Sequence, residues 1–129
     1  MKNASILLFV FASLILSSCS NLPPAKGSVE HIVLAWLKKP GNEADHAKLI
    51  EAAKSLKASI PEVQSLSVGR SIPSERPIVD SSFDIALVMN FKSKAAMDSY
   101  EKSPVHQKAV KEILAPLTSK IVVHDFTNE

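Results

Sequence analysis

The chain has 129 residues, of which 46% are hydrophobic and 22% charged, so it is long enough for one domain, too short for two, and too apolar to be disordered. Lysine and arginine total 15 against 13 acidic residues, a formal net charge of +2. These charges are interspersed rather than gathered into a basic stripe, so no nucleic-acid partner is expected. The single cysteine excludes disulfide frameworks and cysteine-based metal centres, which need at least two thiolates.

The N-terminal residues have the pattern of an export signal. Lys2 is followed by an almost uninterrupted apolar run over residues 6–16, which is shorter than the roughly 20 residues of a membrane-spanning helix. This pattern predicts a signal peptide over residues 1–18. The run ends in Leu16-Ser17-Ser18-Cys19, which resembles the lipobox of bacterial lipoproteins and implies that Cys19 carries a lipid. The alternative is a secretory peptide that merely contains a cysteine.

The residues after Cys19 predict where the protein is anchored. Ser20 in the next position resembles the signal for transfer to the outer membrane of Gram-negative bacteria, so we expect a protein anchored there and facing the periplasm. Residues 19–28 contain two prolines and a glycine and no apolar periodicity, which is typical of a tether. The domain is then expected over residues 29–126, with a short tail over residues 127–129.

The first half of the domain predicts a strand, a helix and a second strand. Residues 29–38 alternate with apolar side chains on both faces, which is typical of a strand covered on both sides. Asn42 is a suitable cap for a helix that ends at Ile60. We expect His46, in the first turn of this helix, to be solvated. The second strand is expected from the alternation over residues 66–72.

The second half predicts the remaining strands and a broken helix. A third strand is expected from Phe83 to Phe91, after a turn-rich connection. Ser93 is a suitable helix cap, and the helical pattern restarts at Ser103-Pro104, because proline is tolerated in a first helical turn but not inside a helix. Residues 120–126 alternate as a fourth strand.

The predicted order of elements is βαββαβ, which indicates an α+β, ferredoxin-like sandwich. Right-handed crossovers place both helices on one face of a four-stranded antiparallel sheet and leave the other face bare. Because the first strand is apolar on both sides, this bare face would expose a larger apolar patch than a monomer usually tolerates. We therefore expect a homodimer.

Four segments together resemble the stress-responsive dimeric A/B barrel (Dabb) family, over about residues 29–126. The most specific segment is Tyr100-Glu101-Lys102-Ser103-Pro104-Val105-His106-Gln107, which is similar to the family's Tyr-x-x-His-Pro-x-His stretch, with Ser103 in place of the first histidine. The resemblance implies a ferredoxin-like subunit that pairs into a dimeric α+β barrel. The other three segments are Val29-Glu30-His31-Ile32-Val33-Leu34, Ile60-Pro61-Glu62-Val63 and Ile121-Val122-Val123-His124-Asp125-Phe126.

The resemblance also implies candidate site residues. Some members are described only as stress-responsive, whereas a plant member is a polyketide cyclase that works by aldol chemistry without a cofactor. Its catalytic tyrosine and histidine correspond to Tyr100 and His106, and a histidine that lines its pocket corresponds to His31. Because the Ser103 departure leaves both catalytic positions in place, it bears on the identity of the substrate more than on the chemistry.

Aldol and isomerase chemistry require a base beside a carbonyl compound and a donor for the developing oxyanion. Imidazole and phenol suit these roles, so His106 is the candidate base and Tyr100 the candidate donor. The two residues lie about 240° apart around an unbroken helix, so their convergence depends on the break at Ser103-Pro104. The alternative is structural: a tyrosine with a buried ring and a histidine bonded to backbone.

The remaining polar residues leave two classes of function open. Asp125 is a candidate to orient an imidazole, or is an exposed acid at a strand end. Antiparallel pairing of the first and last strands places His31 near His124, but without a third ligand no metal is expected, and no cofactor either. The sequence therefore predicts an envelope protein that binds a small apolar or carbonyl ligand or, alternatively, a cofactor-independent cyclase or isomerase.

Overall fold

The structure, a computed structural model, describes residues 23–129. The predicted signal peptide, Cys19 and the start of the predicted tether lie outside the described residues. Within residues 23–129, no helix is both long enough and apolar enough to cross a membrane. The elements in chain order are β1 (Val29–Leu37), α1 (Glu43–Ser59), β2 (Val63–Arg70), β3 (Ile85–Phe91), α2 (Lys94–Lys102), α3 (Pro104–Ala109), the π-helical turn η1 (Val110–Leu114), α4 (Ala115–Leu117) and β4 (Thr118–Thr127).

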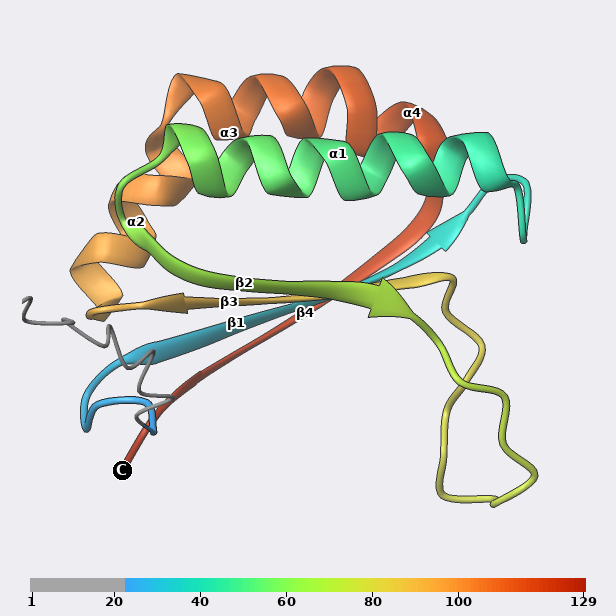
Figure 1. Cartoon of the computed structure of the whole chain (residues 1–129), viewed down its shortest axis with the longest axis horizontal. Coiled ribbons are helices and arrows are strands. Elements are labelled where there is room, and N and C mark those ends of the chain that lie inside the picture. Colours follow the sequence, from blue (N-terminus) through green and yellow to red (C-terminus); the bar gives the residue numbers. More distant parts are fainter. Residues whose placement is uncertain (1–22) are drawn as a thin grey trace, which may run out of the picture.

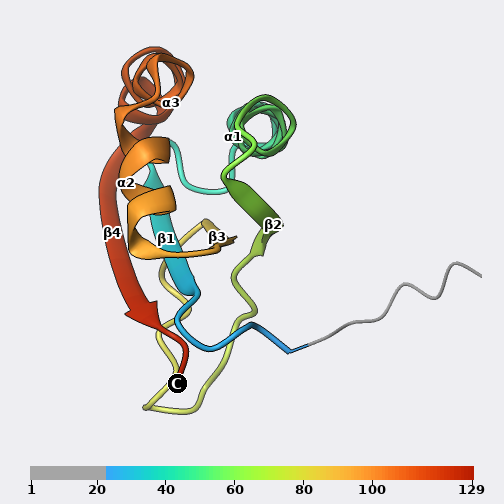
Figure 2. The same cartoon turned by 90° about the vertical axis from the view of Figure 1, so that its left-hand side faces the viewer.

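The four strands form one antiparallel sheet in the order β2-β3-β1-β4. The helices lie together on one side of this sheet (Figure 1), as the view turned by 90° also shows (Figure 2). The ferredoxin-like fold predicted from the element order is therefore confirmed. The caps are local: the Asn42 side chain accepts a hydrogen bond from the Asp45 N–H, and Ser93 accepts one from the Ala96 N–H, which satisfies free donors of a first helical turn.

Burial alternates along β1, because successive side chains of a strand point to opposite faces. Val29, His31, Val33, Ala35 and Leu37 are buried beneath the helices, whereas the residues between them are half-buried. The half-buried residues of β1 belong to an apolar surface on the other side of the sheet, which also includes their partners on β3 and β4. We call it the open face; its apolar members are Ile32, Leu34, Trp36, Ala86, Val88, Val122 and Phe126.

The core beneath the helices consists of two separate clusters. The larger contains Phe91 and Met89, which are 0% and 1% exposed, together with Tyr100 at 3%. The smaller contains Leu37, Leu49 and Ile85. Helix α1 contributes to both clusters, through Leu56 to the larger one and Leu49 to the smaller one.

The second and third strands are displaced from their predicted bounds. The second was expected over residues 66–72, but β2 ends at Arg70, and Ile72 is 81% exposed. Pro73 cannot donate a ladder hydrogen bond. The third strand begins at Ile85 rather than Phe83, whose ring instead packs edge-on against Trp36 with 6.4 Å between centroids. The connection, residues 71–84, is called the arm below.

The prediction that His46 is solvated is wrong. His46 is 3% exposed, and its Nε2 lies 3.8 Å from Oδ1 of Asp84. Asp84 also accepts hydrogen bonds from the N–H of Leu37 at 2.8 Å and of Gly41 at 3.0 Å. The first turn of α1 is buried because this carboxylate draws the end of β1 and the β1–α1 turn together, which the helical pattern alone does not reveal.

Replacement of Asp84 by asparagine should lower the free energy of unfolding by about 1–3 kcal/mol. The two N–H groups bond to different carboxylate oxygens, and an amide offers only one acceptor oxygen. Asp80→Asn is the matched control, because Asp80 is exposed and accepts hydrogen bonds only from the nearby Ser82, so the change should alter stability by less than about 0.5 kcal/mol. Chemical denaturation measures both, and equal effects would contradict the role given to Asp84.

Candidate functional site

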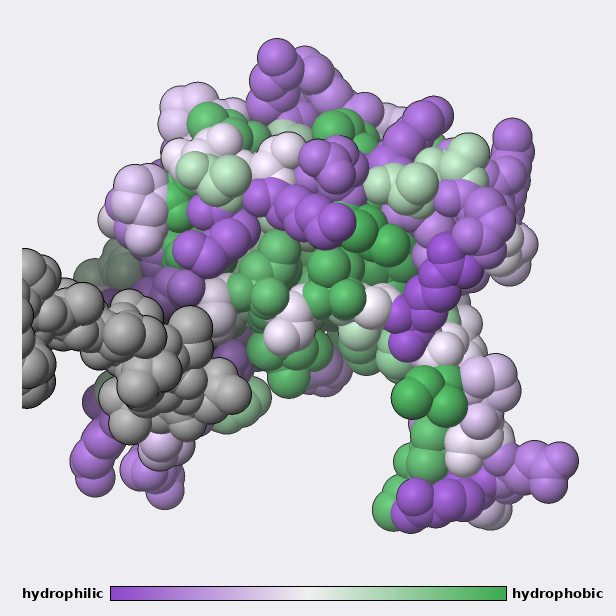
Figure 3. All heavy atoms as spheres, viewed as in Figure 1, coloured by the Kyte–Doolittle hydropathy of each residue, from purple (hydrophilic) through white to green (hydrophobic). Residues whose placement is uncertain are grey.

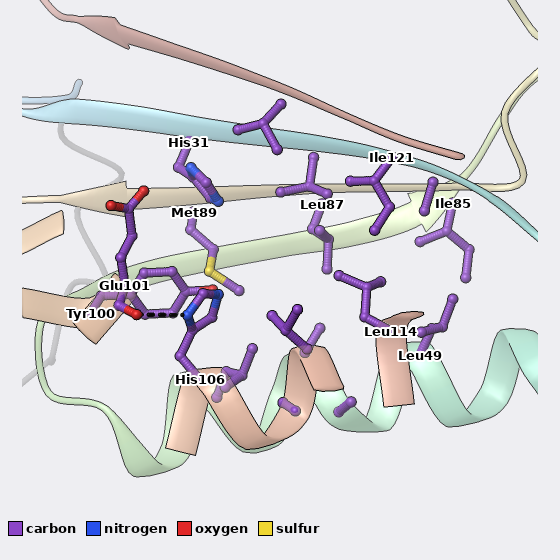
Figure 4. Close-up of a pocket in the computed structure, with 18 residues that line it drawn as sticks. His31, Leu49, Ile85, Leu87, Met89, Tyr100, Glu101, His106, Leu114 and Ile121 are labelled. Atoms are coloured by element: carbon purple, nitrogen blue, oxygen red, sulfur yellow. Dashed lines mark hydrogen bonds between the residues drawn. The ribbon is translucent and has the colours of Figure 1, made fainter. Parts of the chain in front are cut away.

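A cavity of about 450 Å³ lies between the helices and the sheet (Figure 4). This volume is within the range of about 300–1,000 Å³ that is typical of small-molecule sites. Ile121 and Val123 of the edge strand β4 line the cavity yet are 38% and 46% exposed, so it opens to solvent along this edge. Its other apolar lining residues are Val33, Ala35, Leu49, Ala52, Ala53, Leu56, Ile85, Leu87, Met89, Ala109, Val110 and Leu114.

The polar lining residues gather at one end of the cavity. They are His31, Tyr100, Glu101 and His106, and Figure 4 shows them at the end opposite Leu49, Ile85 and Leu114. The cavity therefore has a polar end and an apolar end. A ligand that fills it needs one hydrogen-bonding head and an apolar remainder, since burying further polar groups among these side chains would cost free energy.

Tyr100 and His106 meet because the helix breaks between them. Helix α2 ends at Lys102, Ser103 has φ −59° and ψ 130°, and α3 begins at Pro104. An extended residue before proline is the expected conformation. The two rings then lie 4.3 Å apart between centroids, at an angle of 42°. The convergence that the sequence makes conditional on Ser103-Pro104 is present in the structure.

The protonation of His106 follows from its backbone contact. Nδ1 lies 3.2 Å from the carbonyl oxygen of Glu101, and because a carbonyl only accepts, Nδ1 carries the proton in the neutral ring. Nε2 is then left with its lone pair. His106 is half-buried and lines the cavity, so it can serve as a proton acceptor there.

Tyr100 is a buried phenol held by other rings. It is 3% exposed, with centroids 5.0 Å from Phe91 and 5.9 Å from His31. Burial raises the pKa of Tyr100, and the negative charge of Glu101 acts in the same direction. The phenol therefore stays protonated at neutral pH and can donate a hydrogen bond into the cavity.

His31 and Asp125 form a cross-strand pair. They are direct partners in the register of β1 with β4, and Nδ1 of His31 lies 2.6 Å from Oδ1 of Asp125. The carboxylate accepts, so the contact fixes the orientation of the ring with the proton on Nδ1. The His31 side chain is 8% exposed and that of Asp125 is 39% exposed. Asp125 thus contacts an imidazole, as required if its role is to orient a histidine rather than to be only an exposed acid at a strand end.

His124 does not join this site. It pairs with Ile32, so its side chain lies on the open face while that of His31 lies beneath the helices. The two histidines are on neighbouring strands, as expected, but on opposite faces of the sheet. Residues 23–129 contain no group of three or more histidine, cysteine or acidic side chains placed to hold a metal ion.

Sequence reasoning missed one contributor to the site, the backbone carbonyl of Glu101. The carbonyls of a last helical turn lack partners within the helix, and α2 ends one residue after Glu101. The break predicted at Ser103-Pro104 therefore also indicates that a backbone carbonyl without a partner in the helix lies nearby. The apolar lining was only partly foreseen, because it comes from β1, β3, β4, α1, α3 and η1 together.

Comparison with known proteins agrees with this architecture. Residues 29–128 match the sequence profile of the Stress responsive A/B Barrel Domain. The chain belongs to this family. No match was found among curated proteins, so the family assignment rests on the profile match. This confirms the family resemblance that the sequence segments predicted.

Solved structures of similar fold place this A/B barrel protein among ferredoxin-like proteins. A Dabb family protein from Mesorhizobium loti is 22% identical, with a TM-score of 0.67 over 81% of this chain and 99% of that one. A dimeric ferredoxin-like protein from Bacteroides fragilis is 25% identical, with a TM-score of 0.65 over 80% and 98%. A hydroxynitrile lyase from Passiflora edulis is 23% identical, with a TM-score of 0.71 over 81% and 96%.

The raised pKa of Tyr100 predicts a loss of stability at alkaline pH. An unfolded tyrosine ionises near pH ~10, whereas the folded one ionises above that, so the stabilising effect is complete below pH ~10 and is lost as the pH rises towards the folded pKa. Tyr100 is the only tyrosine, so tyrosinate absorbance reports this residue alone.

The folded protein should therefore show no tyrosinate absorbance at pH values where the unfolded chain is already half ionised. Tyr100→Phe should reduce the alkaline loss of unfolding free energy. Ionisation of Tyr100 in the folded protein at pH ~10 would contradict the presence of a buried, protonated phenol.

Proposed function

We propose that this A/B barrel protein binds a small ligand with a carbonyl head and an apolar tail. The observation that carries the proposal is the placement of Tyr100, His106 and His31 at one end of an otherwise apolar cavity. Among residues 23–129 the Tyr100 hydroxyl is not one of the buried polar atoms that lack a partner, so its oxygen reaches the open cavity that Tyr100 lines and can donate a hydrogen bond there. A ligand carbonyl oxygen would accept this hydrogen bond.

The apolar end of the cavity supports the proposal that the ligand has an apolar tail. Leu49, Ile85 and Leu114 lie there (Figure 4), and side chains of this kind reward an aliphatic tail at about 0.8 kcal/mol for each buried methylene group. Polar side chains that could hold a second polar group are absent from that end of the described cavity. The ligand class is thus an aliphatic ketone, aldehyde or acyl compound.

The second candidate function is a cofactor-independent cyclase or isomerase of polyketide-cyclase type. The observation that favours it is the His106 tautomer, in which the Glu101 carbonyl holds the Nδ1 proton and Nε2 is free. Nε2 would remove a proton from the carbon beside the carbonyl, and the electron pair would move onto the carbonyl oxygen.

Tyr100 would donate a hydrogen bond to the resulting enolate oxygen. The enolate carbon would then attack a second carbonyl of the same ligand, whose oxygen would take the proton back from His106, which is a cyclase reaction. In an unsaturated ligand, the extended enolate would instead take that proton from His106 at a carbon further along the chain, which is an isomerase reaction. A similar structure belongs to a hydroxynitrile lyase, which supports the capacity of this fold to house an enzyme.

The same proposal includes location and assembly. Cys19, preceded by the lipobox-like residues, would carry a lipid that anchors the domain at the outer membrane, facing the periplasm. The open face would pair with that of a second copy into a dimeric barrel, because its central side chains are apolar. The Bacteroides fragilis protein of the same fold is dimeric.

Loss of either polar group should weaken binding of methyl ketones of increasing chain length, measured by titration calorimetry. Tyr100→Phe removes one hydrogen bond, worth about 0.5–1.5 kcal/mol, and should lower affinity by about two- to tenfold. His106→Ala should abolish exchange of the ketone's α-hydrogens with deuterium, followed by NMR, while lowering unfolding free energy by less than about 1 kcal/mol.

His124→Ala is the matched control, because this histidine lies outside the cavity; it should leave ketone affinity unchanged. Unaltered affinity in Tyr100→Phe and His106→Ala, together with a stability loss of roughly 1–3 kcal/mol, would show that the pair is structural. Ketone binding without any α-hydrogen exchange in the wild-type protein would retain the binding function and remove the enzymatic one.

The anchor has its own test, which is mass spectrometry of the N-terminus of protein isolated from the membrane fraction of its source cell. The expected result is a chain that begins at lipidated Cys19. An intact Met1 or an unmodified Cys19 would contradict the anchor, and would leave the cavity proposal unaffected.

A further inference from the structure

The arm, residues 71–84, carries the most exposed large hydrophobic side chains of the described chain. Ile72 is 81% exposed and Ile78 is 84% exposed, against at most 49% for the others of this kind. Both cartoon views show the arm projecting from the sheet on the side away from the helices (Figures 1 and 2). Figure 3 shows hydrophobic surface along this projection. Apolar side chains in such a position indicate a contact surface.

The arm is held in place at its base. Ser82 accepts a hydrogen bond from Nε1 of Trp36 at 3.0 Å, and Phe83 packs edge-on against the same indole. Asp84 fixes the last residue to the N–H groups of Leu37 and Gly41. A projection that is ordered before it meets its partner loses less conformational entropy on binding.

Trp36 makes the arm continuous with the open face. Its indole contacts the base of the arm, and it is also one of the apolar residues of the open face. The arm therefore extends the surface through which two copies would pair. One partner that covers the open face is placed to cover the arm as well.

We propose that the arm of each subunit clasps a second copy of this chain, with Ile72 and Ile78 buried against the partner. The proposal rests on the homodimer put forward above. A twofold axis gives each subunit one arm to donate and one surface to receive the other arm. A membrane surface fits less well, because the exposed part of the arm has two acidic residues, Glu75 and Asp80, against the single basic Arg76, and anionic lipids favour basic segments.

The test compares the dimer dissociation constant of the full chain with that of the double variant Ile72→Ser, Ile78→Ser, both in the same non-ionic detergent. Sedimentation gives the masses, and dilution followed by the fluorescence of Trp36, the only tryptophan, gives the constants. The double variant should dissociate at a concentration at least tenfold higher than the wild-type chain. At concentrations where both chains are monomeric, their denaturation profiles should be the same. Val105→Ser is the control, because Val105 is 44% exposed on α3, in the helical layer, and should leave the constant unchanged.

The outcomes separate the two proposals. A wild-type chain that is monomeric at micromolar concentration overturns the homodimer and the clasp together. A wild-type dimer whose dissociation constant is the same in the double variant overturns the clasp alone. If the double variant keeps the dimer constant but loses retention on phosphatidylglycerol vesicles, the arm contacts lipid and the clasp is likewise overturned.

Discussion

Proline cannot donate the backbone hydrogen bond that a helix interior requires, and its ring forces the preceding residue out of helical geometry. At Ser103 and Pro104 this constraint ends α2 and starts α3 in a new direction. The turn places the ring of His106 against that of Tyr100 and leaves the Glu101 carbonyl to accept from His106. The polar end of the cavity is thus a consequence of the backbone break.

The cavity exists because the helices do not close fully onto the sheet. Leu56, Met89 and Tyr100 belong to the larger core cluster, Leu49 and Ile85 to the smaller one, and all five line the cavity. The two clusters support the helical layer at either end, and small side chains such as Ala35 and Ala53 leave the space between them unfilled. The His31–Asp125 pair then tightens the β1–β4 edge beside the polar end. The packed clusters that stabilise the fold thus lie towards the two ends of the helical layer, and the cavity lies between them.

The sequence predicted what depends on local chemistry and strand periodicity. The two-sided apolar pattern of β1, the Asn42 and Ser93 caps and the break before Pro104 are all present, because each follows from a few adjacent residues. The prediction failed where contacts between segments far apart in the chain determine the structure. His46 is buried by Asp84, which lies far along the chain, and β2 ends before Ile72 because its register with β3 ends at the Arg70–Ile85 pair. Contacts of this kind leave no periodic trace in the sequence.

The central claim is that Tyr100 and His106 act as one site, and NMR of the folded protein tests it most directly. Because the chain has a single tyrosine, a nuclear Overhauser effect between its ring protons and those of His106 is expected from the centroid separation of 4.3 Å. The ring ¹⁵N shifts of His106 should show the proton on Nδ1 and a free Nε2, and addition of a methyl ketone should perturb both rings together. Absence of the Overhauser effect, or a neutral His106 with its proton on Nε2, would contradict the account.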